Sequence, residues 1–523
     1  MKKEGMELSE QKMKQEHLYE KLQQLEINGK YPFHMPGHKR NTELLPKWNP
    51  YAMDLTEIDG FDNLHDAQEI LADTMQEIAD FRQAEESFLL VNGSSGGLLA
   101  GISACVSHGD EMILARNCHK AVYHAILVNE LTPSYIYPQF SHNLGINGGI
   151  YRKKVKKMLI SHPNAKVLVL TSPTYEGVVS DIEGIVEEAH LHGIPVLVDQ
   201  AHGAHFGMGE QFPRSAVTYG ADIVVESVHK TLPAFTQTAL LHVQGNLVDR
   251  EKLRFYLSVF QTSSPSYVLM AGIDWCMEFC KKEKTQFLLY EERLGRLRAE
   301  ISRLDHIVLF DGELTSKEFA AKDYDTGKLV FGVKDRIFSG QWLYEHLRED
   351  YGLEMEMASL NYVIAMTSVM DREEGFQKLL HALEEINELA KQKADETEEK
   401  NCVNNSDKRV IGHAERIRER EGVLTLHMGN GNWENSDQDG ACVQSLSPYE
   451  AWSRPGKMVL FSDSEGEIAK SMISLYPPGI PLIVPGEQIS GVLIAYVLEC
   501  EKQGLQVKGL TEKKIQVVDG NGL

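Results

Sequence analysis

Ser227-Val228-His229-Lys230-Thr231 directly follows an apolar, strand-like run, Ala221-Asp222-Ile223-Val224-Val225-Glu226. A lysine at the end of a buried strand is costly unless its charge is paired or its amine is used chemically. Burial lowers the pKa of a lysine, and the neutral amine can form a Schiff base with an aldehyde. The stretch alone leaves two interpretations open. Lys230 is either a solvated loop lysine or a reactive amine whose polar neighbours hold a phosphate.

A second stretch has the composition of a phosphate-binding turn. The strand-like run 87–91 leads into Asn92-Gly93-Ser94-Ser95-Gly96-Gly97, and a helix is expected to begin at Leu98. Backbone N–H groups at a helix N-terminus and serine hydroxyls bind phosphate. The turn is neither Gly-X-Gly-X-X-Gly nor a Walker loop, which argues against a dinucleotide or ATP. A smaller phosphate ligand is favoured, with a plain strand-to-helix turn as the alternative.

Apolar runs alternate with helical segments over the first half of the chain. This pattern predicts an α/β fold with a mostly parallel sheet covered on both faces. Ligands bind at the carboxyl ends of such strands, where the polar clusters of this sequence fall. The runs cover residues 112–115, 166–171, 194–198, 223–225 and 239–243.

An aldehyde partner for Lys230 and a phosphate at residues 92–97 together predict pyridoxal phosphate (PLP). The PLP ring withdraws electrons only while its pyridine nitrogen stays protonated, and an adjacent carboxylate keeps it so. Asp199 is the candidate because it stands at the tip of the apolar run 194–198. A helix N-cap is the alternative role for this aspartate.

Charge and cysteine content limit the classes of partner. The 523-residue chain has a net charge of −23, which makes nucleic acid an unfavourable partner and serves either solubility or attraction of cations. The 7 cysteines are scattered and complete no zinc site, so we expect no metal and reduced, cytoplasmic thiols. Neither a signal-peptide pattern nor an apolar run of about 18 residues is present, so we expect no membrane span.

The order of the polar clusters resembles fold-type I PLP enzymes, and more narrowly the bacterial ornithine/lysine/arginine decarboxylases. A late segment, Tyr476-Pro477-Pro478-Gly479-Ile480-Pro481 followed by Pro485-Gly486-Glu487, is similar to the signature of that group's C-terminal domain. The resemblance covers roughly residues 30 to 510. The other clusters that carry it are Met35-Pro36-Gly37-His38, Asn92-Gly93-Ser94-Ser95, Cys118-His119-Lys120, Asp199-Gln200-Ala201-His202 and Ser227-Val228-His229-Lys230.

The resemblance implies a role for each cofactor-binding residue. Lys230 would be the Schiff-base lysine and Asp199 would face the pyridine nitrogen. His119 would stack on one face of the ring and Ala201 would pack against the other. His202 stands where some members carry a bulkier aromatic residue, so its role is open. The phosphate would be held by Ser94, Ser95, Gly96, Ser227 and His229.

The resemblance also implies a site shared between subunits. Thr262, within Gln261-Thr262-Ser263-Ser264-Pro265, would reach the phosphate of a partner subunit in a homodimer. Glu487 would lie near the distal cationic end of the substrate. Inducible members carry an N-terminal wing domain that builds decamers, and only about thirty residues precede Met35 here. A dimer, or a dimer of dimers, is therefore expected.

Helical spacing of Leu18, Leu22 and Leu25, a polar and charged composition over residues 395–409, and the same resemblance together give a domain order. We expect an N-terminal helix over residues 1–30, a PLP-binding large domain over 31–305 and a small α/β domain over 306–394. A polar linker over 395–409 would lead to a C-terminal α+β domain over 410–523. The loop 31–40, rich in proline and histidine, is either a basic surface turn or a segment entering an active site.

The implied function is PLP-dependent decarboxylation of a basic amino acid to an amine that serves as a polyamine precursor. Arginine, giving agmatine, is favoured because wing-less members of the group are often arginine decarboxylases. Lysine and ornithine stay open. The competing hypotheses are a PLP-dependent aminotransferase or aldolase on the same fold, and a non-catalytic regulator that binds PLP or a polyamine.

Overall fold

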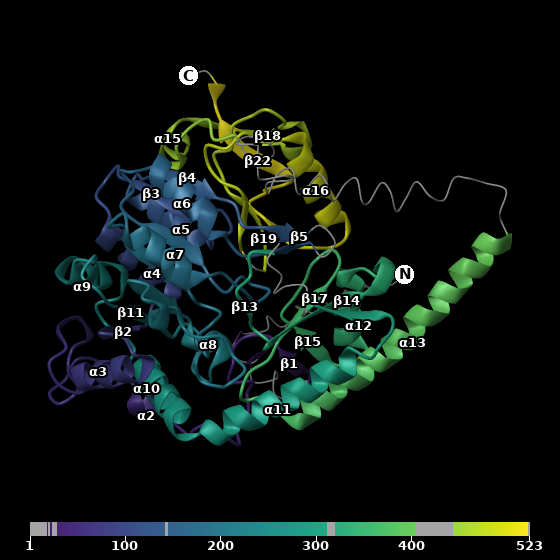
Figure 1. The fold of residues 1–523 in the computed structure, drawn as a ribbon, viewed down its shortest axis with the longest axis horizontal. Helices are drawn as coiled ribbons and strands as arrows, with labels where there is room; N and C mark the ends of the chain where they lie inside the picture. The colour runs from purple at the N-terminus through teal and green to yellow at the C-terminus, as the bar shows by residue number, and fades with distance from the viewer. Residues whose placement is uncertain are drawn as a thin grey trace, which may run out of the picture.

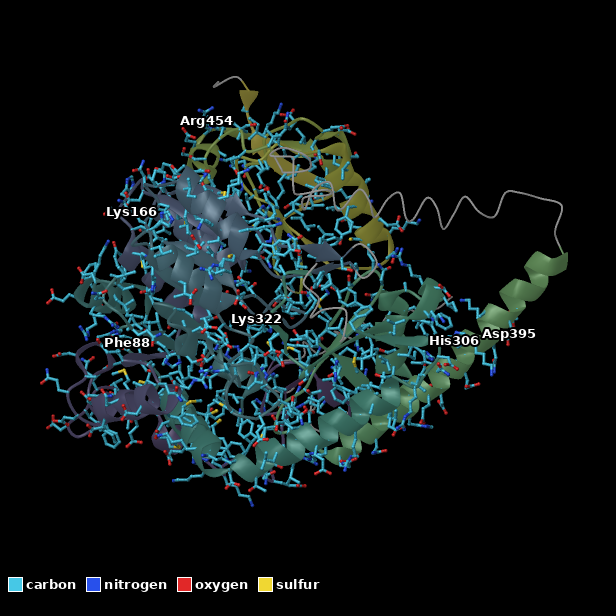
Figure 2. All side chains as sticks on the ribbon, in the orientation of Figure 1. Phe88, Lys166, His306, Lys322, Asp395 and Arg454 are labelled. Carbon is cyan, nitrogen blue, oxygen red and sulfur yellow. The ribbon has the colours of Figure 1, made fainter. Side chains whose placement is uncertain are left out.

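A computed structural model describes residues 18, 21–22, 29–141, 145–310, 319–403, 443–477 and 479–520. It contains a large sheet with its helices, a smaller sheet flanked by two long helices, and a C-terminal region beside the large sheet (Figure 1). Side chains fill the space between these regions (Figure 2). The predicted helix over residues 1–30 falls almost wholly outside the described residues.

The large sheet confirms the predicted α/β class. Its seven strands run in the order β2-β11-β10-β9-β7-β3-β4, and only β11 is antiparallel to its neighbours. The central strands are buried Val, Ile and Leu runs, as expected for a sheet with both faces covered. The strands are β2 (Glu86–Leu90), β3 (Glu111–Ala115), β4 (Thr132–Ile136), β7 (Leu168–Thr171), β9 (Val196–Asp199), β10 (Ile223–Glu226) and β11 (Ala239–Val243).

Helix α4 (Gly93–Cys105) begins earlier than the sequence indicated. The Gly/Ser stretch is the first turn of the helix rather than a turn before it. Gly97 allows α4 to pack closely against the sheet, because a Cβ there would lie 2.5 Å from Leu90 Cδ1 and 3.1 Å from Val225 Cγ1. Only glycine lets the helix approach the sheet so closely. The other helices around the sheet are α3 (Ile70–Arg82), α5 (Lys120–Val128), α6 (Arg152–Ser161), α7 (Ile182–His190), α8 (Val228–Thr231) and α9 (Arg250–Phe260).

The second sheet is antiparallel, with strand order β12-β14-β17-β16. A short strand, β1 (Tyr31–Phe33), pairs in parallel with β15 (Leu353–Met355), so the start of the described chain packs on this region. The strands are β12 (Ile307–Leu309), β14 (Lys328–Val333), β16 (Met357–Ala358) and β17 (Val363–Met366), and helices α10 (Tyr267–Lys282), α11 (Lys284–Ile301), α12 (Gly340–Glu349) and α13 (Glu373–Val403) accompany them.

Helix α13 packs beside α11 (Figure 1) and runs on to Val403. The predicted linker over residues 395–409 is therefore helical in its first part, and the rest of it falls outside the described residues. Residues 395–400, Asp-Glu-Thr-Glu-Glu-Lys, include three glutamates and one lysine, which are good helix formers and are compatible with a continued helix. Composition alone did not separate a solvated helix from a linker.

The C-terminal region has a core of its own, in which Phe461, Ile473, Leu493 and Val517 are buried. Val484 instead packs into the core of the large sheet, which joins the two regions. Its sheets pair β18 with β22, and β19 with both β20 and β21. The elements are α15 (Pro448–Ser453), β18 (Gly456–Leu460), β19 (Ile473–Leu475), β20 (Pro481–Ile483), α16 (Gly491–Lys502), β21 (Val507–Lys508) and β22 (Lys514–Val518).

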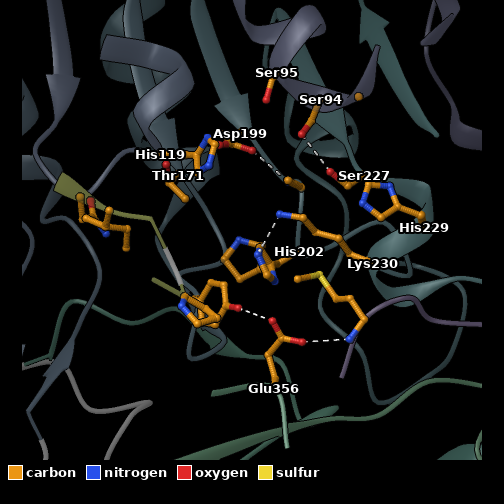
Figure 3. A pocket seen from close by; sticks show the side chains of 18 of the residues that line it. Ser94, Ser95, His119, Thr171, Asp199, His202, Ser227, His229, Lys230 and Glu356 are labelled. Atoms are coloured by element: carbon orange, nitrogen blue, oxygen red, sulfur yellow. Dashed lines mark hydrogen bonds between the residues drawn. The ribbon is translucent and has the colours of Figure 1, made fainter. Parts of the chain in front are cut away.

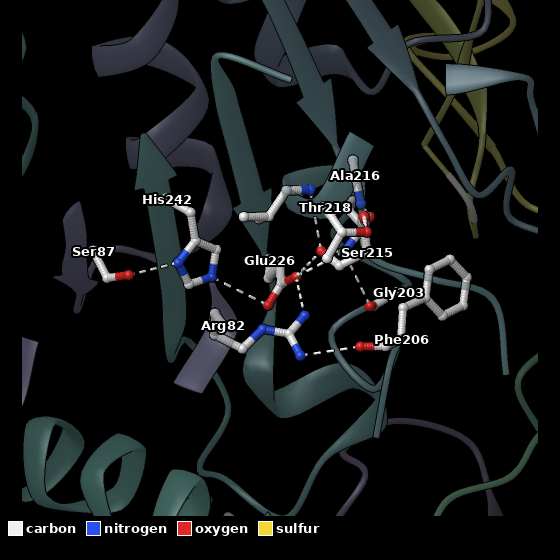
Figure 4. Close-up of polar contacts among 11 residues, drawn as sticks. Arg82, Ser87, Gly203, Phe206, Ser215, Ala216, Thr218, Glu226 and His242 are labelled. Atoms are coloured by element: carbon white, nitrogen blue, oxygen red, sulfur yellow. Dashed lines mark hydrogen bonds and ion pairs between the residues drawn. The ribbon is translucent and has the colours of Figure 1, made fainter. Parts of the chain in front are cut away.

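A buried polar cluster around Glu226 fixes the end of β10, just before Lys230 (Figure 4). Arg82 Nη2 lies 2.5 Å from Glu226 Oε1, and Gln200 Nε2 donates to the same oxygen at 2.7 Å. His242 Nε2 lies 3.3 Å from Oε2. Burial alone would raise the pKa of Glu226, but Arg82 and His242 hold it below 4.5. The carboxylate is therefore ionised and paired at neutral pH.

Candidate active site

A cavity of about 270 Å³ opens at the carboxyl ends of β7, β9 and β10 (Figure 3). The small sheet and the C-terminal region complete its walls. Most residues that the sequence singled out line this one cavity. They are Ser94, Ser95, His119, Asp199, Ala201, His202, Ser227, His229 and Lys230.

Lys230 lies on the short helix α8, which follows directly on β10. Its Nζ lies 3.0 Å from Nε2 of His202. Burial lowers the pKa of Lys230, and the negative charges of Asp199 and Glu356 oppose that shift. A buried amine with a lowered pKa has the reactivity that a Schiff base requires.

Asp199 is the last residue of β9 and is buried. Its Oδ1 accepts a hydrogen bond from the backbone N–H of Ala201 at 3.1 Å. Burial raises the pKa of Asp199, while the Lys230 charge and the Ala201 hydrogen bond lower it. A cation beside this carboxylate would favour the ionised form.

Polar groups gather at the N-terminus of α4. Ser227 Oγ donates to Ser94 Oγ at 2.9 Å, and Ser95 lies beside it in the first helical turn. The first N–H groups of a helix have no partner within the helix, so this end suits an anion. Gly96 belongs to the same turn but does not line the cavity. It faces Asn92 and the Phe260 backbone instead.

Two histidines of the cavity are neutral near pH 7. His119, the N-cap of α5, accepts from the backbone N–H of Ala121, and burial lowers its pKa to about 3. His229 Nδ1 lies 2.8 Å from the carbonyl of Thr238, and burial lowers its pKa to about 4. A neutral, flat His119 ring is suited to stacking on an aromatic cofactor.

Glu356, between β15 and β16, is a cavity residue that the sequence did not reveal. It accepts hydrogen bonds from the Tyr175 hydroxyl at 2.5 Å and from the backbone N–H of Met35 at 2.9 Å. With Asp199 it supplies the carboxylates that line the cavity. The only available signal was a charged side chain inside a strand-like run, Leu353-Glu354-Met355-Glu356.

The prediction for Glu487 is corrected by the structure. Glu487 is fully buried and does not line the cavity. Its two oxygens accept from Arg116 Nε at 3.1 Å and Arg116 Nη2 at 2.9 Å, a bidentate pair. The pair attaches the C-terminal region to the end of β3 and leaves this carboxylate no free face for a substrate. The C-terminal signature reaches the cavity through Tyr476, Pro477 and Ile480 instead.

Thr262 does not line the cavity of its own chain. Its backbone carbonyl lies 2.8 Å from Nε2 of His65, and its side chain is exposed. This position is compatible with a role toward a partner subunit, which stays a prediction.

The cavity has the groups that PLP requires. A reactive lysine, a carboxylate at a strand end and a serine-lined helix N-terminus converge on it. Asn117 Oδ1, which lines the same cavity, is buried without a hydrogen-bond partner among the described residues. A buried oxygen of this kind is costly unless a ligand or water satisfies it. The residues present therefore fit the cofactor.

The doubly covered, mostly parallel sheet and this arrangement at its edge define the fold-type I class of PLP-dependent enzymes. Within that class, residues 16–322 match the family described as "Orn/Lys/Arg decarboxylase, major domain", and residues 443–519 match its C-terminal domain. The chain belongs to this family and is a decarboxylase of a basic amino acid. The match decides against the aminotransferase, aldolase and regulator hypotheses.

Similar proteins agree with this family. The chain is 32% identical over 484 residues to an arginine decarboxylase of Halalkalibacterium halodurans, covering 91% of each. It is 29% identical over 495 residues to an arginine decarboxylase of Bacillus subtilis, covering 93% of this chain and 94% of the relative. A solved lysine decarboxylase of Francisella novicida shares the fold, with a TM-score of 0.72, 18% identity and coverage of 96% of this chain and 84% of that one.

Within the described residues, no helix combines the length and apolar character needed to cross a bilayer.

Proposed function

We propose that this protein is an arginine decarboxylase that binds PLP at Lys230 and releases agmatine and CO₂. The observation that carries the proposal is the convergence of Lys230, Asp199 and Glu356 on one cavity. The arginine decarboxylases of similar sequence support the choice of substrate.

Bound PLP supplies an electron sink for the pair left on Cα when CO₂ departs. The residues of the chain would hold it in place. Asp199 would keep the pyridine nitrogen protonated, and His119 and Ala201 would flank the ring. The phosphate would lie at the α4 N-terminus, held by Ser94, Ser95, Ser227 and His229.

Glu356 is the proposed contact for the distal cation of the substrate. It is the second carboxylate of the cavity and is already oriented by Tyr175 and by the Met35 backbone. Two fixed carboxylate oxygens suit the planar, bidentate geometry of a guanidinium. An ammonium needs only a point contact, so lysine and ornithine would be held less specifically.

We also propose a homodimer in which Thr262 of one subunit approaches the phosphate bound by its partner, and a cytoplasmic location. The exposed side chain of Thr262, on a loop outside its own cavity, supports the shared site. Thr262→Ala is expected to weaken PLP binding without altering the cavity of its own chain. Sedimentation at several protein concentrations would test the dimer.

The direct test is release of CO₂ from arginine, lysine and ornithine, measured in parallel on the purified protein. Arginine is expected to react with the highest kcat/KM, and the protein is expected to be yellow. A preference for lysine or ornithine would change the proposed substrate but not the proposed reaction. A colourless protein that does not take up added PLP would overturn the cofactor proposal.

A further inference from the structure

His202 stands between two lysines from different regions of the fold. Its Nε2 lies 3.0 Å from Nζ of Lys230, and its Nδ1 lies 2.9 Å from Nζ of Lys328 on β14. Lys328 is 1% exposed and His202 is 7% exposed, so bulk water does not separate these groups. The three side chains form a continuous hydrogen-bonded row, Lys328–His202–Lys230.

This row limits how many protons the three bases hold. A neutral imidazole has one N–H and one lone pair, whereas an ammonium only donates. If both lysines were ammonium ions, both ring nitrogens would have to accept, which neutral imidazole cannot do. An imidazolium would donate at both ends and would require two neutral amines. The row therefore holds at most one net positive charge.

The surroundings of Lys328 favour placing the single positive charge of the row on this lysine. Its Nζ lies 5.9 Å from the centre of the Tyr175 ring, within cation–π range. The buried carboxylate of Asp325 also favours the charged lysine, and this carboxylate is ionised because His205 Nε2 lies 3.0 Å from it. Although burial lowers the pKa of Lys328, it does so only to about 8, so the ammonium form predominates at pH 7.

We propose that Lys328 is a positioning residue that keeps the Lys230 amine unprotonated through His202. Lys328 donates to His202 Nδ1, which fixes the tautomer with a proton on Nε2, and that N–H donates to the lone pair of Lys230. Lys230 is thus held as a neutral nucleophile aimed by a hydrogen bond. The inference rests on the proposed role of Lys230 as the PLP lysine.

The same row is a route for one proton. Transfer from Lys328 Nζ to His202 Nδ1, with simultaneous transfer of the Nε2 proton to Lys230, leaves Lys328 neutral and Lys230 an ammonium. Decarboxylation breaks the bond between Cα and the carboxylate, and the electron pair then forms a C–H bond. Each turnover therefore consumes one proton, and the row delivers one to the amine of Lys230.

Other charged and titratable groups also face Lys230. The carboxylates of Asp199 and Glu356 raise its pKa, which opposes the effect of Lys328. The imidazoles of His119 and His229 also lie close, but burial keeps both neutral. Among the described residues, only Lys328 places a positive charge at the Nδ1 end of the His202 ring, so its removal is expected to favour protonation of Lys230.

The test measures the rate at which PLP-free protein forms the yellow Schiff base with added PLP, as a function of pH. The amine reacts in its neutral form, so the rate rises as pH passes the pKa of Lys230. Lys328→Met removes the positive charge that keeps Lys230 neutral, so Lys230 is expected to hold a proton up to a higher pH. The pH at which the rate is half-maximal (the midpoint) is expected to rise by about one pH unit or more. His202→Phe breaks the row and is expected to raise the midpoint in the same direction.

Two further variants provide controls. Lys328→Arg keeps the charge and the donor, so its midpoint is expected near that of the wild type. Lys39→Met removes another buried lysine, whose Nζ bonds the carbonyls of His34 and Met366 rather than His202, and is expected to leave the midpoint unchanged.

Wild-type midpoints in both Lys328→Met and His202→Phe would overturn the inference, even if PLP affinity fell, because a merely structural role lowers affinity without moving the midpoint. A wild-type protein that never turned yellow would instead defeat the proposed function. The two failures are therefore distinguishable.

Discussion

Glu226 and Lys230 stand four residues apart in the chain, and each lies in a different polar group: the Glu226 cluster and the Lys230 cavity. In the Glu226 cluster, a guanidinium, an imidazole and an amide surround one carboxylate, and both of its oxygens are engaged. In the cavity, the side-chain amine of Lys230 has one hydrogen bond among the described residues, to His202, and His202 in turn contacts a second lysine. The first group is balanced in charge, and the second carries an excess of basic groups.

The difference shows how burial serves two purposes in one fold. Around Glu226, the pairing overcomes the desolvation cost and the pKa falls. Around Lys230, desolvation outweighs the attraction of Asp199 and Glu356. It disfavours the charged form, which for an amine is the protonated one, so the pKa of Lys230 also falls. A change in the first group should therefore act on stability, and a change in the second should act on chemistry.

The largest expected effect comes from Lys230→Ala. Because the reactive amine is lost, decarboxylation is expected to fall by at least about a thousandfold, and the yellow colour should disappear. Thermal stability of the PLP-free protein should be nearly unchanged, since the change removes a buried lysine of lowered pKa. Steady-state rates and a melting curve check both statements. Retained colour would show that another lysine binds PLP.

Arg82→Met is expected to destabilise the fold by about 3–5 kcal/mol, because it leaves Glu226 buried without its guanidinium. The lowered pKa of Glu226 means that its ionised form stabilises the wild type at pH values above 4.5. That contribution is lost as the pH falls through the lowered pKa, so the variant should lose less stability on acidification. Denaturant unfolding at several pH values measures both effects, and equal pH profiles would contradict the expectation.

Glu356→Gln is expected to lower kcat/KM for the preferred substrate by roughly thirty-fold to a few thousandfold, equivalent to about 2–5 kcal/mol, mainly through KM. The colour of the bound cofactor should persist, because Glu356 is proposed to contact the substrate and not the cofactor. Glu487→Gln is the matched control. Its paired carboxylate should affect stability and leave KM near the wild-type value. If Glu487→Gln raised KM and Glu356→Gln did not, Glu487 would be the better candidate for the substrate contact.

Ser95→Ala should have the smallest effect. Loss of one hydroxyl at the α4 N-terminus removes a single neutral donor, worth about 1 kcal/mol, so PLP affinity is expected to fall about fivefold. Equilibrium dialysis with PLP measures the change. An unchanged affinity would mean that the backbone N–H groups and Ser94 hold the phosphate without Ser95.

Local sequence predicted the large sheet and one half of the cavity. Val- and Ile-rich runs ending in Asp199 or Ser227 define both a buried strand and the polar group at its tip. Such short-range patterns do not show which distant segments close the cavity. Glu356 lies between β15 and β16 and Lys328 lies on β14, and their neighbours in the chain do not show that either side chain approaches the large sheet.

Glu487 shows the converse error. Its signature correctly indicated the C-terminal domain, but a carboxylate in a motif does not reveal its partner. Arg116 lies 371 residues away in the sequence, and only the packed structure brings the two together. The sequence therefore predicted the region that reaches the cavity, but not that Glu487 itself lies outside the cavity and pairs with Arg116.

The Arg116–Glu487 pair has a consequence for biosynthesis. Arg116 leaves the ribosome 371 residues before Glu487, and at 5–20 residues per second that interval is roughly 20 to 75 s. Throughout it, the end of β3 lacks the segment that carries Tyr476 and Ile480 and closes the cavity. The nascent chain therefore cannot close its own cavity until the segment from Tyr476 to Glu487 has been synthesised.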